Sequence, residues 1–358
     1  MSRIHSYYNN INLNSFSPTK NSKLDDNPTQ KKNIFYTTDT KREQINTNEQ
    51  PGIIEVYEDN FIEEIKNMSK LLEEYNYIGM DTEFPGTVYS ISNMTKDFYF
   101  KTLKANVDNL KLIQLGITLT NSKGEFPKNS PYHTWQFNFE FDKNSDEITQ
   151  SSLNLLEQCG IDFNKLKAKG IKHKLFAEYF MISGLVLNPD IQWISFHGSY
   201  DFGYLLKLLL NSSLPDTEKE FMDLLDIYFI NYYDIRTLVK GKDNLKGGLN
   251  KLAQSLEVLR EGKTHQAGSD SVVTIDVYFK LINDGFIEKN LILKDKNILF
   301  GVLSDEDNIE TINYSQFNNM NYPNGNNHLN NAMYMPMNLN YNMQYYYMMN
   351  GVGNDNMN

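Results

Sequence analysis

Cysteine is almost absent from this chain: its 358 residues include one, Cys159. A single cysteine excludes an internal disulfide framework and a cysteine-rich zinc site, and it is typical of a reducing compartment. No run of about 18 apolar residues occurs, so we expect no membrane-spanning helix and no membrane partner. The N-terminal stretch MSRIHSYYNN has no apolar core, so we also expect no secretory signal.

Positive charge is scarce as well. The chain has 34 Lys and Arg residues against 45 Asp and Glu residues, which gives a formal net charge of −11. Proteins that coat nucleic-acid phosphates are usually basic, so the charge argues against a generic binder of that kind. It leaves open an enzyme that meets nucleic acid through bound cations.

The composition divides the chain into three parts. Residues 1–50 are rich in Asn, Thr, Lys and Ser, and we expect a disordered extension there. Residues 304–358 form an Asn/Met/Tyr-rich tail with 17 Asn and eight of the 14 Met, which predicts disorder, with a sticky interaction segment as the alternative. Residues 51–303 between them predict one globular domain.

Periodicity within this domain predicts an α/β fold. Helical spacing over 61–75 is followed by a short strand in YNYIGMDTE, and alternation over 112–119 and in YHTWQFNFEF predicts two further strands of an antiparallel meander. The second half alternates helices with the short strands QWISF and YYDI. Helices are expected there at about 175–187, 200–210, 221–229, 249–256 and 272–279. The order predicts a mixed five-stranded sheet with helices on both faces.

The strand in YNYIGMDTE ends in the acidic pair Asp81 and Glu83. Residues i and i+2 of a strand project to the same face, so the two carboxylates point together and repel each other. A hard divalent cation would relieve that repulsion. Taken alone, the pair is more often a solvated strand end.

Two further acids stand at helix entrances. Asp201, in FHGSYDFGY, falls in the first turn of a helix, where the helix dipole favours a carboxylate. Asp270 opens the helix DSVVTIDVYFKL, and His265 lies in the loop ahead of it. Each has an ordinary explanation by itself, namely a first-turn acid and a surface histidine.

Together these residues form the ordered pattern D-x-E, D and H-x-x-x-x-D. The pattern resembles the histidine subgroup of the DEDD exonuclease superfamily, which has a ribonuclease-H-like fold. The resemblance implies that Asp81, Glu83, Asp201 and Asp270 hold two divalent ions, Mg²⁺ or Mn²⁺. It implies His265 as the general base beside the attacking water.

Longer stretches resemble the CAF/POP family of poly(A) deadenylases, from about Gly52 to about Leu303. They are IGMDTEFPGTVY, ANVDNLKLIQLGITL, TWQFNFEFD, WISFHGSYDFGYLLKLL and NLKGGLNKLAQSLEVLREGKTHQAGSDS. The family implies 3′→5′ removal of adenylate from mRNA tails with release of AMP. It also implies docking onto a large NOT scaffold subunit and contact with a second deadenylase through that partner's leucine-rich repeats. The implied location is the cytoplasm, with the nucleus and mRNA-decay granules also open.

The chain departs from the family pattern in two places. Gly198 and Ser199 exchange the usual Ser-Gly order before Asp201, and 87–91 lacks the Arg-Pro common in animal relatives. None of the five metal or base positions is lost. Two other functions stay open: a DEDD nuclease that acts on DNA or very short RNA, and a mainly structural bridge between the scaffold and another nuclease.

Residues near the acids are candidates for RNA contact. Phe84 follows the acidic pair and would either stack on a terminal adenine or pack under the strand end, and Pro85 borders it. Lys246 would hold a phosphate or be a solvated lysine. His197 would support Asp201 or simply pack, and Asp234, which has no place in the pattern, is interpreted as structural.

Overall fold

A computed structural model describes residues 52–91, 97–260 and 262–302. The predicted extension 1–50 and tail 304–358 lie outside the described residues, so both stay predictions. Among the described helices, none combines the length and the apolar character that crossing a bilayer needs.

The strands are β1 (Ile53–Val56), β2 (Tyr77–Glu83), β3 (Gln114–Thr120), β4 (Thr134–Asn138), β5 (Gln192–Ser195) and β6 (Tyr232–Asp234). The helices are α1 (Phe61–Ser69), α2 (Phe98–Asn109), α3 (Gln150–Gln158), α4 (Phe163–Lys169), α5 (His173–Met181), α6 (Ser199–Leu210), α7 (Glu218–Tyr228), α8 (Ile235–Leu238), α9 (Leu249–Ser255), α10 (Ala267–Asn283) and α11 (Lys289–Lys294). A 3₁₀ turn spans Asp243–Leu245.

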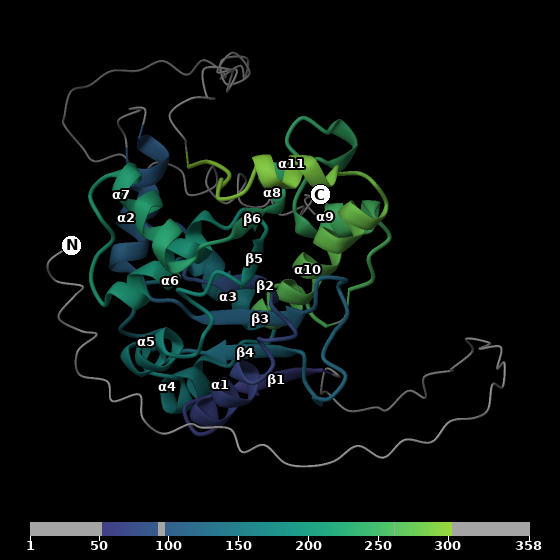
Figure 1. The fold of residues 1–358 in the computed structure, drawn as a ribbon. Coiled ribbons are helices and arrows are strands. Elements are labelled where there is room, and N and C mark those ends of the chain that lie inside the picture. Colours follow the sequence, from purple (N-terminus) through teal and green to yellow (C-terminus); the bar gives the residue numbers. More distant parts are fainter. Residues whose placement is uncertain (1–51, 92–96, 261, 303–358) are drawn as a thin grey trace, which may run out of the picture. The chain divides into compact units, whose positions relative to one another are not determined.

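The strands form one mixed sheet in the order β1-β4-β3-β2-β5-β6, which Figure 1 shows stacked from β1 at the bottom to β6 at the top. The predicted meander is confirmed, because β2, β3 and β4 pair antiparallel. The sheet has six strands where the sequence predicted five. The additional strand, β1, is only four residues long and pairs parallel to the edge of β4, too short to show an alternating pattern.

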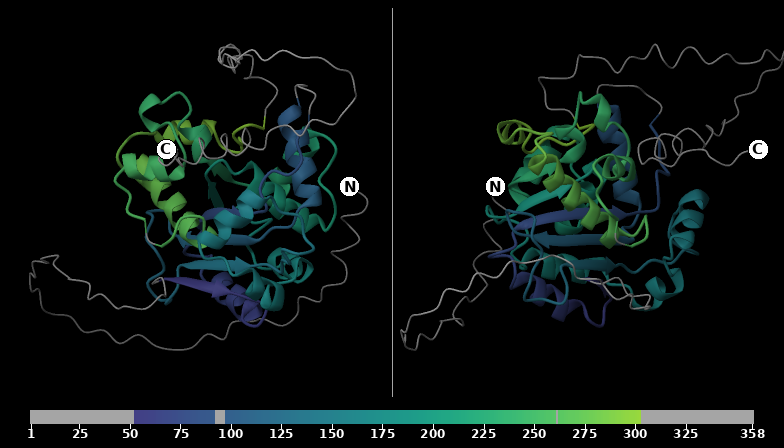
Figure 2. Two further views of the ribbon diagram at one scale, coloured as in Figure 1. Left: turned by 180° about the vertical axis from the view of Figure 1, so that it is seen from behind. Right: turned by 90° about the vertical axis from the view of Figure 1, so that its right-hand side faces the viewer.

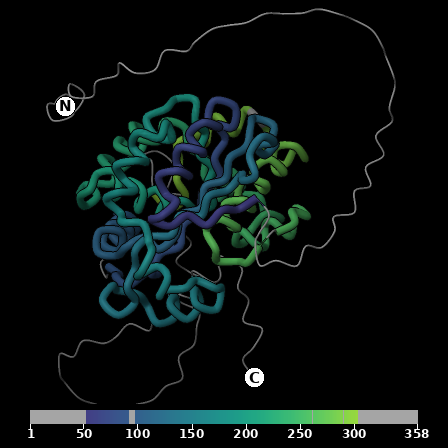
Figure 3. Tube along the Cα trace, turned by 90° about the horizontal axis from the view of Figure 1, so that it is seen from below, coloured from purple at the N-terminus to yellow at the C-terminus, as the bar shows by residue number. Residues whose placement is uncertain are grey.

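Helices cover both faces of the sheet, as predicted. In Figure 1, α2, α5, α6 and α7 lie to the left of the strands and α9 and α10 to the right, and the view from behind in Figure 2 shows the same separation. Figure 3, which looks onto the β1 edge, places the teal and green segments on opposite sides. Helix α2, which joins β2 to β3, was not predicted, because loops were expected there.

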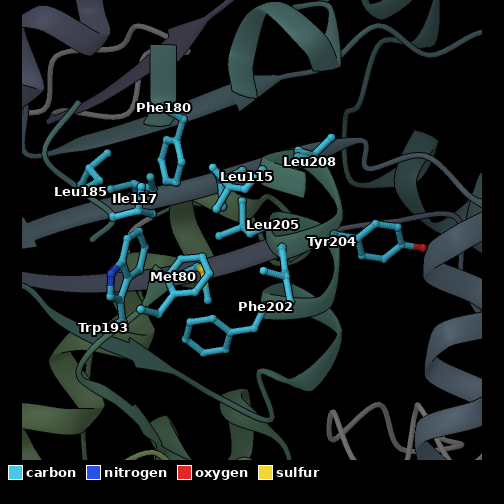
Figure 4. Close-up of a cluster of buried hydrophobic side chains, with 14 of the residues drawn as sticks. Met80, Leu115, Ile117, Phe180, Leu185, Trp193, Phe202, Tyr204, Leu205 and Leu208 are labelled. Carbon is cyan, nitrogen blue, oxygen red and sulfur yellow. The ribbon is translucent and has the colours of Figure 1, made fainter. Parts of the chain in front are cut away.

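The α6 face of the sheet is apolar. Alternate residues Met80 on β2 and Leu115 and Ile117 on β3 are fully buried there, and they pack with Phe202 and Leu205 of α6 (Figure 4). Burial of this face supplies the main hydrophobic stabilisation of the domain, since each large apolar side chain contributes about 1.5–3 kcal/mol.

On β3 and β4 the opposite face carries small and polar residues, and it lies under α10. A Cβ atom on Gly116 of β3 would sit 1.9 Å from the carbonyl oxygen of Ala267, and one on Gly79 of β2 would sit 2.5 Å from that of Ser271. Glycine therefore lets the α10 backbone rest directly on the sheet. Because Gly116 pairs with Asp81 in the sheet, the start of α10 lies over the acidic end of β2.

Candidate active site

The acidic pair ends β2, as predicted. Strand alternation places Asp81 and Glu83 on the α10 side of the sheet and Thr82 on the α6 side. Glu83 is buried and Asp81 partly exposed. The two carboxylates therefore face the N-terminus of α10.

Side-chain amides from the sheet hold that N-terminus in place. Gln136 Oε1 accepts the backbone N–H of Gly268 at 2.8 Å, and Gln114 Oε1 accepts that of Ala267 at 3.4 Å. Gln266 Nε2 donates to the carbonyl oxygen of Cys159 at 2.9 Å, which ties the preceding loop to the end of α3. These bonds satisfy helix N–H groups that would otherwise lack partners, and they fix Asp270 one turn into the helix.

Asp270 and His265 are linked directly. Asp270 Oδ2 accepts the backbone N–H of His265 at 3.0 Å, and His265 adopts a left-handed conformation with φ of 57°. One ligand atom each of Glu83, His265 and Asp270 lies within 4.8 Å of the others, and all three residues are buried. This set of oxygen donors with one imidazole fits a divalent cation.

A pocket of about 60 Å³ opens between these groups. It is lined by Asp81, Thr82, Glu83, Phe196, Leu249, Asn250, Arg260, His265 and Asp270. Four of the five predicted metal or base residues therefore share one cavity.

Asp201 stands beside this pocket and is not among its lining residues. It lies in the first turn of α6, as predicted, and is buried. Its Oδ1 accepts a hydrogen bond from Thr82 Oγ1 at 2.5 Å. Its charge still acts on the pair across β2, because it contributes to the raised pKa of both Asp81 and Glu83.

The turn before Asp201 is held by Asp234. Its carboxylate accepts the backbone N–H groups of His197 at 2.8 Å and Gly198 at 3.1 Å, and also those of Arg236 and Phe300. Asp234 is fully buried on β6 and lies outside the pocket lining. It therefore supports the turn and does not join the acid cluster.

The exchanged Gly198-Ser199 pair fits this turn. A Cβ atom at position 198 would lie 2.2 Å from Ser195 Oγ, so glycine is the residue that fits there. The hydroxyl of Tyr99 is 2.6 Å from Ser199 Oγ and 3.2 Å from His197 Nε2. His197 thus packs and bonds away from the acids.

Burial and mutual repulsion dominate the electrostatics of the cluster. Burial first, then the neighbouring carboxylates, raises the pKa of Asp81 and Glu83 well above the ordinary range. Burial raises the pKa of Asp201 to about 7, against the lowering effect of the Thr82 hydrogen bond. Burial lowers the pKa of His265, which favours the neutral imidazole. The acids lack sufficient counter-charge, and divalent cations would supply it.

Arg260 was not predicted as a residue of the site. Its guanidinium forms an ion pair with Asp270 Oδ1, donates to Ser269 Oγ at 3.2 Å, and donates to Asn250 Oδ1 on α9. It also lowers the pKa of Asp81 and Glu83. The sequence signal that could have identified Arg260 is its position five residues before His265.

The three predicted RNA-contact residues lie outside the pocket lining. Phe84 is half-buried and stacks on Tyr200 with ring centroids 5.2 Å apart and an interplanar angle of 11°. Pro85 is buried, and its carbonyl oxygen accepts the backbone N–H of Thr149. Lys246 is 68% exposed and pairs with Asp243.

Comparison with known proteins agrees with this geometry. Residues 56–178 match the model of the CAF1 family ribonucleases. The chain is 44% identical over 257 residues to the probable CCR4-associated factor 1 homolog 7 of Arabidopsis thaliana, which covers 70% of this chain and 93% of the relative. The chain belongs to the CAF1 ribonuclease family. Poly(A) ribonuclease pop2 of Schizosaccharomyces pombe is 39% identical over 256 residues, 70% of this chain and 75% of the relative.

Solved structures of family members share the fold. The Mg²⁺- and Mn²⁺-bound structure of S. pombe Pop2p aligns with a TM-score of 0.66 over 70% of this chain and 99% of that one. CAF1, co-crystallised with the yeast NOT1 MIF4G domain, aligns with a TM-score of 0.59 at 27% identity, over 72% of this chain and 100% of the matched one. The domain thus has the ribonuclease-H-like fold of the family.

The acid cluster should destabilise the metal-free protein. Carboxyls with a raised folded pKa bind more protons in the folded state than in the unfolded one, so stability falls as pH rises from about 4 to about 7 and beyond. Asp81→Asn removes one repelling charge, so at pH 8 in EDTA its free energy of unfolding should exceed that of the wild type by about 1–3 kcal/mol.

Urea unfolding at pH 5 and pH 8 measures this difference. The gain should shrink at pH 5, because the raised pKa of Asp81 makes its protonated fraction in the folded wild type larger there than at pH 8. Asp216→Asn is the control, since Asp216 is 95% exposed and should change stability little. An Asp81→Asn protein less stable than the wild type at pH 8 would contradict the repulsion.

Proposed function

We propose that this chain is a metal-dependent 3′→5′ poly(A) exoribonuclease that shortens mRNA tails and releases AMP. One observation carries the proposal: Asp81, Glu83, His265 and Asp270 line a single pocket. Family membership supports the reaction, since a relative is named a poly(A) ribonuclease. The divalent ions bound in the S. pombe structure support the cofactor class.

Asp81, Glu83, Asp201 and Asp270 are the residues that would hold two divalent cations, Mg²⁺ or Mn²⁺. When bound, such cations neutralise charge on the reacting phosphate and lower the pKa of a coordinated water. Asp201 would take part from the position in which Thr82 Oγ1 holds its carboxylate. Four acids with two such cations form a locally neutral site, which would let a protein of net charge −11 accept RNA.

His265 is the proposed general base. Its lowered pKa keeps an imidazole nitrogen unprotonated at neutral pH, so it can take a proton from the attacking water. The Asp270 carboxylate fixes the backbone of His265 through the 3.0 Å hydrogen bond. The short loop into α10 thus places a proton acceptor beside the acids.

Phe84, Pro85 and Lys246 remain proposed RNA contacts. The Phe84 ring stacks on Tyr200 and also contacts the Tyr204 ring, with centroids 5.3 Å apart, so a base would meet the part of the ring that neither tyrosine covers. The exposed ammonium group of Lys246 has only the exposed Asp243 as its ion-pair partner and would reach a phosphate farther along the strand. Pro85 would set the direction of the loop after Phe84.

The proposal predicts degradation of oligo(A) from its 3′ end. Purified protein with 5′-labelled oligo(A) and Mg²⁺ or Mn²⁺ should give a descending ladder on a denaturing gel, and oligo(U) and DNA of equal length should be cut more slowly. Asp201→Asn should lower the rate by about 10²-fold or more, because a metal ligand is lost. Asp216→Asn should match the wild type.

Two outcomes would contradict this proposal. An undiminished rate in Asp201→Asn would remove that residue from the site. Faster cleavage of oligo(U) or DNA than of oligo(A) would favour a DEDD nuclease of other specificity.

Substitutions of His265 and Asp270 should differ in their effects on turnover and on Mn²⁺ affinity. His265→Ala should lower turnover by about 10²–10⁴-fold with Mn²⁺ affinity nearly unchanged, because a proton acceptor is lost. Asp270→Ala should lower both turnover and Mn²⁺ affinity. Calorimetric Mn²⁺ titration beside single-turnover rates tests this, and equal loss of Mn²⁺ affinity in the two variants would refute the base assignment.

We also propose that the chain docks onto a NOT scaffold subunit and works beside a second deadenylase with leucine-rich repeats. The co-crystal of CAF1 with the yeast NOT1 MIF4G domain supports the first contact. An immobilised NOT1 MIF4G domain should retain both the wild type and Asp81→Ala, since bridging needs no chemistry. Absence of retention would contradict the docking. A cytoplasmic location and the domain bounds 51–303 remain predictions.

A further inference from the structure

Arg260 supplies positive charge to a pocket that is otherwise lined by acids. Three carboxylates line the pocket, those of Asp81, Glu83 and Asp270, and the guanidinium of Arg260 is the cationic side chain among the lining residues. Arg260 is 18% exposed, so solvent screens its charge only in part.

The position of the guanidinium is specific. Nη1 donates to Asp270 Oδ1 and to Ser269 Oγ, while Nη2 donates to Asn250 Oδ1 on α9. The other carboxylate oxygen of Asp270 accepts the backbone N–H of His265. Asp270 is therefore bonded on both oxygens by the one loop that runs from Arg260 to His265.

We propose that Arg260 is a built-in counter-ion that holds Asp270 in the metal-free protein and competes with the divalent cation for it. The inference rests on the proposed function, because it takes Asp270 as a metal ligand. A guanidinium and a divalent cation on the same carboxylate oxygen would repel each other strongly in this partly buried site. The guanidinium consequently has to leave Oδ1 when the cation binds.

The surrounding contacts give the guanidinium a place to remain after that exchange. Asn250 Oδ1 is a second anchor on a different element, so the side chain can stay at the pocket wall while it releases Asp270. Arg260 is thus a positioning residue in the metal-free state and a competitor during metal loading. The exchange keeps the acids from being left without any counter-charge.

A purely supportive role for Arg260 would have the opposite effect on metal binding. If Arg260 only oriented Asp270 for the cation, its removal would misplace the ligand and weaken metal affinity. If it competes, its removal strengthens metal affinity and destabilises the metal-free protein. The sign of the change in Mn²⁺ affinity therefore separates the two roles.

The test is Mn²⁺ titration of the EDTA-treated full chain at fixed pH, with free Mn²⁺ followed by electron paramagnetic resonance. Arg260→Gln should bind Mn²⁺ about tenfold tighter than the wild type, which corresponds to about 1.4 kcal/mol. Its metal-free Tm should be lower and its Mn²⁺-induced rise in Tm larger. Arg260→Lys keeps the charge but lacks the planar fork, so its Mn²⁺ affinity should lie between the two.

Lys263→Gln is the matched control. It removes one positive charge from the same loop, and Lys263 is exposed and outside the pocket lining, so its Mn²⁺ affinity should stay within about twofold of the wild type. An equal gain in Lys263→Gln would overturn the inference in favour of a general charge effect.

Unchanged or weaker Mn²⁺ binding by Arg260→Gln, or by Arg260→Lys if the glutamine variant fails to fold, would also overturn it. In that case a wild type that binds Mn²⁺ leaves the proposed function standing. A wild type that binds no Mn²⁺ would overturn the proposed metal site, and this inference with it.

Discussion

Repulsion between closely placed carboxylates is the main physical constraint on the structure of this domain. Asp81, Glu83, Asp201 and Asp270 come from three separate elements and meet at the end of one central strand. Left alone, such groups would move apart or take up protons, and the raised pKa values of three of them record that tendency. The surrounding structure must therefore hold the acids rigidly enough to keep them close before any cation binds.

The rigid support comes from the sheet face under α10. Gly79 and Gly116 bring the helix backbone onto the strands, and Gln114 and Gln136 complete the hydrogen bonds of its first N–H groups. These contacts place Asp270 over the end of β2. On the other face of the sheet, the apolar core fixes α6 and so fixes Asp201.

Much of this arrangement could be predicted from alternation and spacing in the sequence. The i, i+2 relation put Asp81 and Glu83 on one face, and alternation identified the apolar side of β3 and β4. Alternation alone does not distinguish a polar face under water from one under a helix, so the covering of the polar side was predicted from the order of strands and helices instead. α2 was missed although Phe100, Leu103 and Val107 recur with helical spacing, and β1 is too short to give a periodic signal.

Other features depend on contacts between distant parts of the chain. The pattern D-x-E, D, H-x-x-x-x-D predicted that Asp201 joins the cluster, yet its bond to Thr82, a residue 119 positions away, sets where the carboxylate points. Arg260 stands five residues before His265, but its role follows from where α9 and α10 bring Asn250 and Asp270. Asp234, interpreted from the sequence as structural, lies outside the pocket lining, although the four N–H groups that it accepts were not foreseen.

The most direct test of the shared site is anomalous diffraction from crystals of this protein soaked in Mn²⁺. Two manganese peaks should appear at the carboxylates of Asp81, Glu83, Asp201 and Asp270. No manganese at these acids, or peaks only at exposed surface carboxylates, would contradict the account.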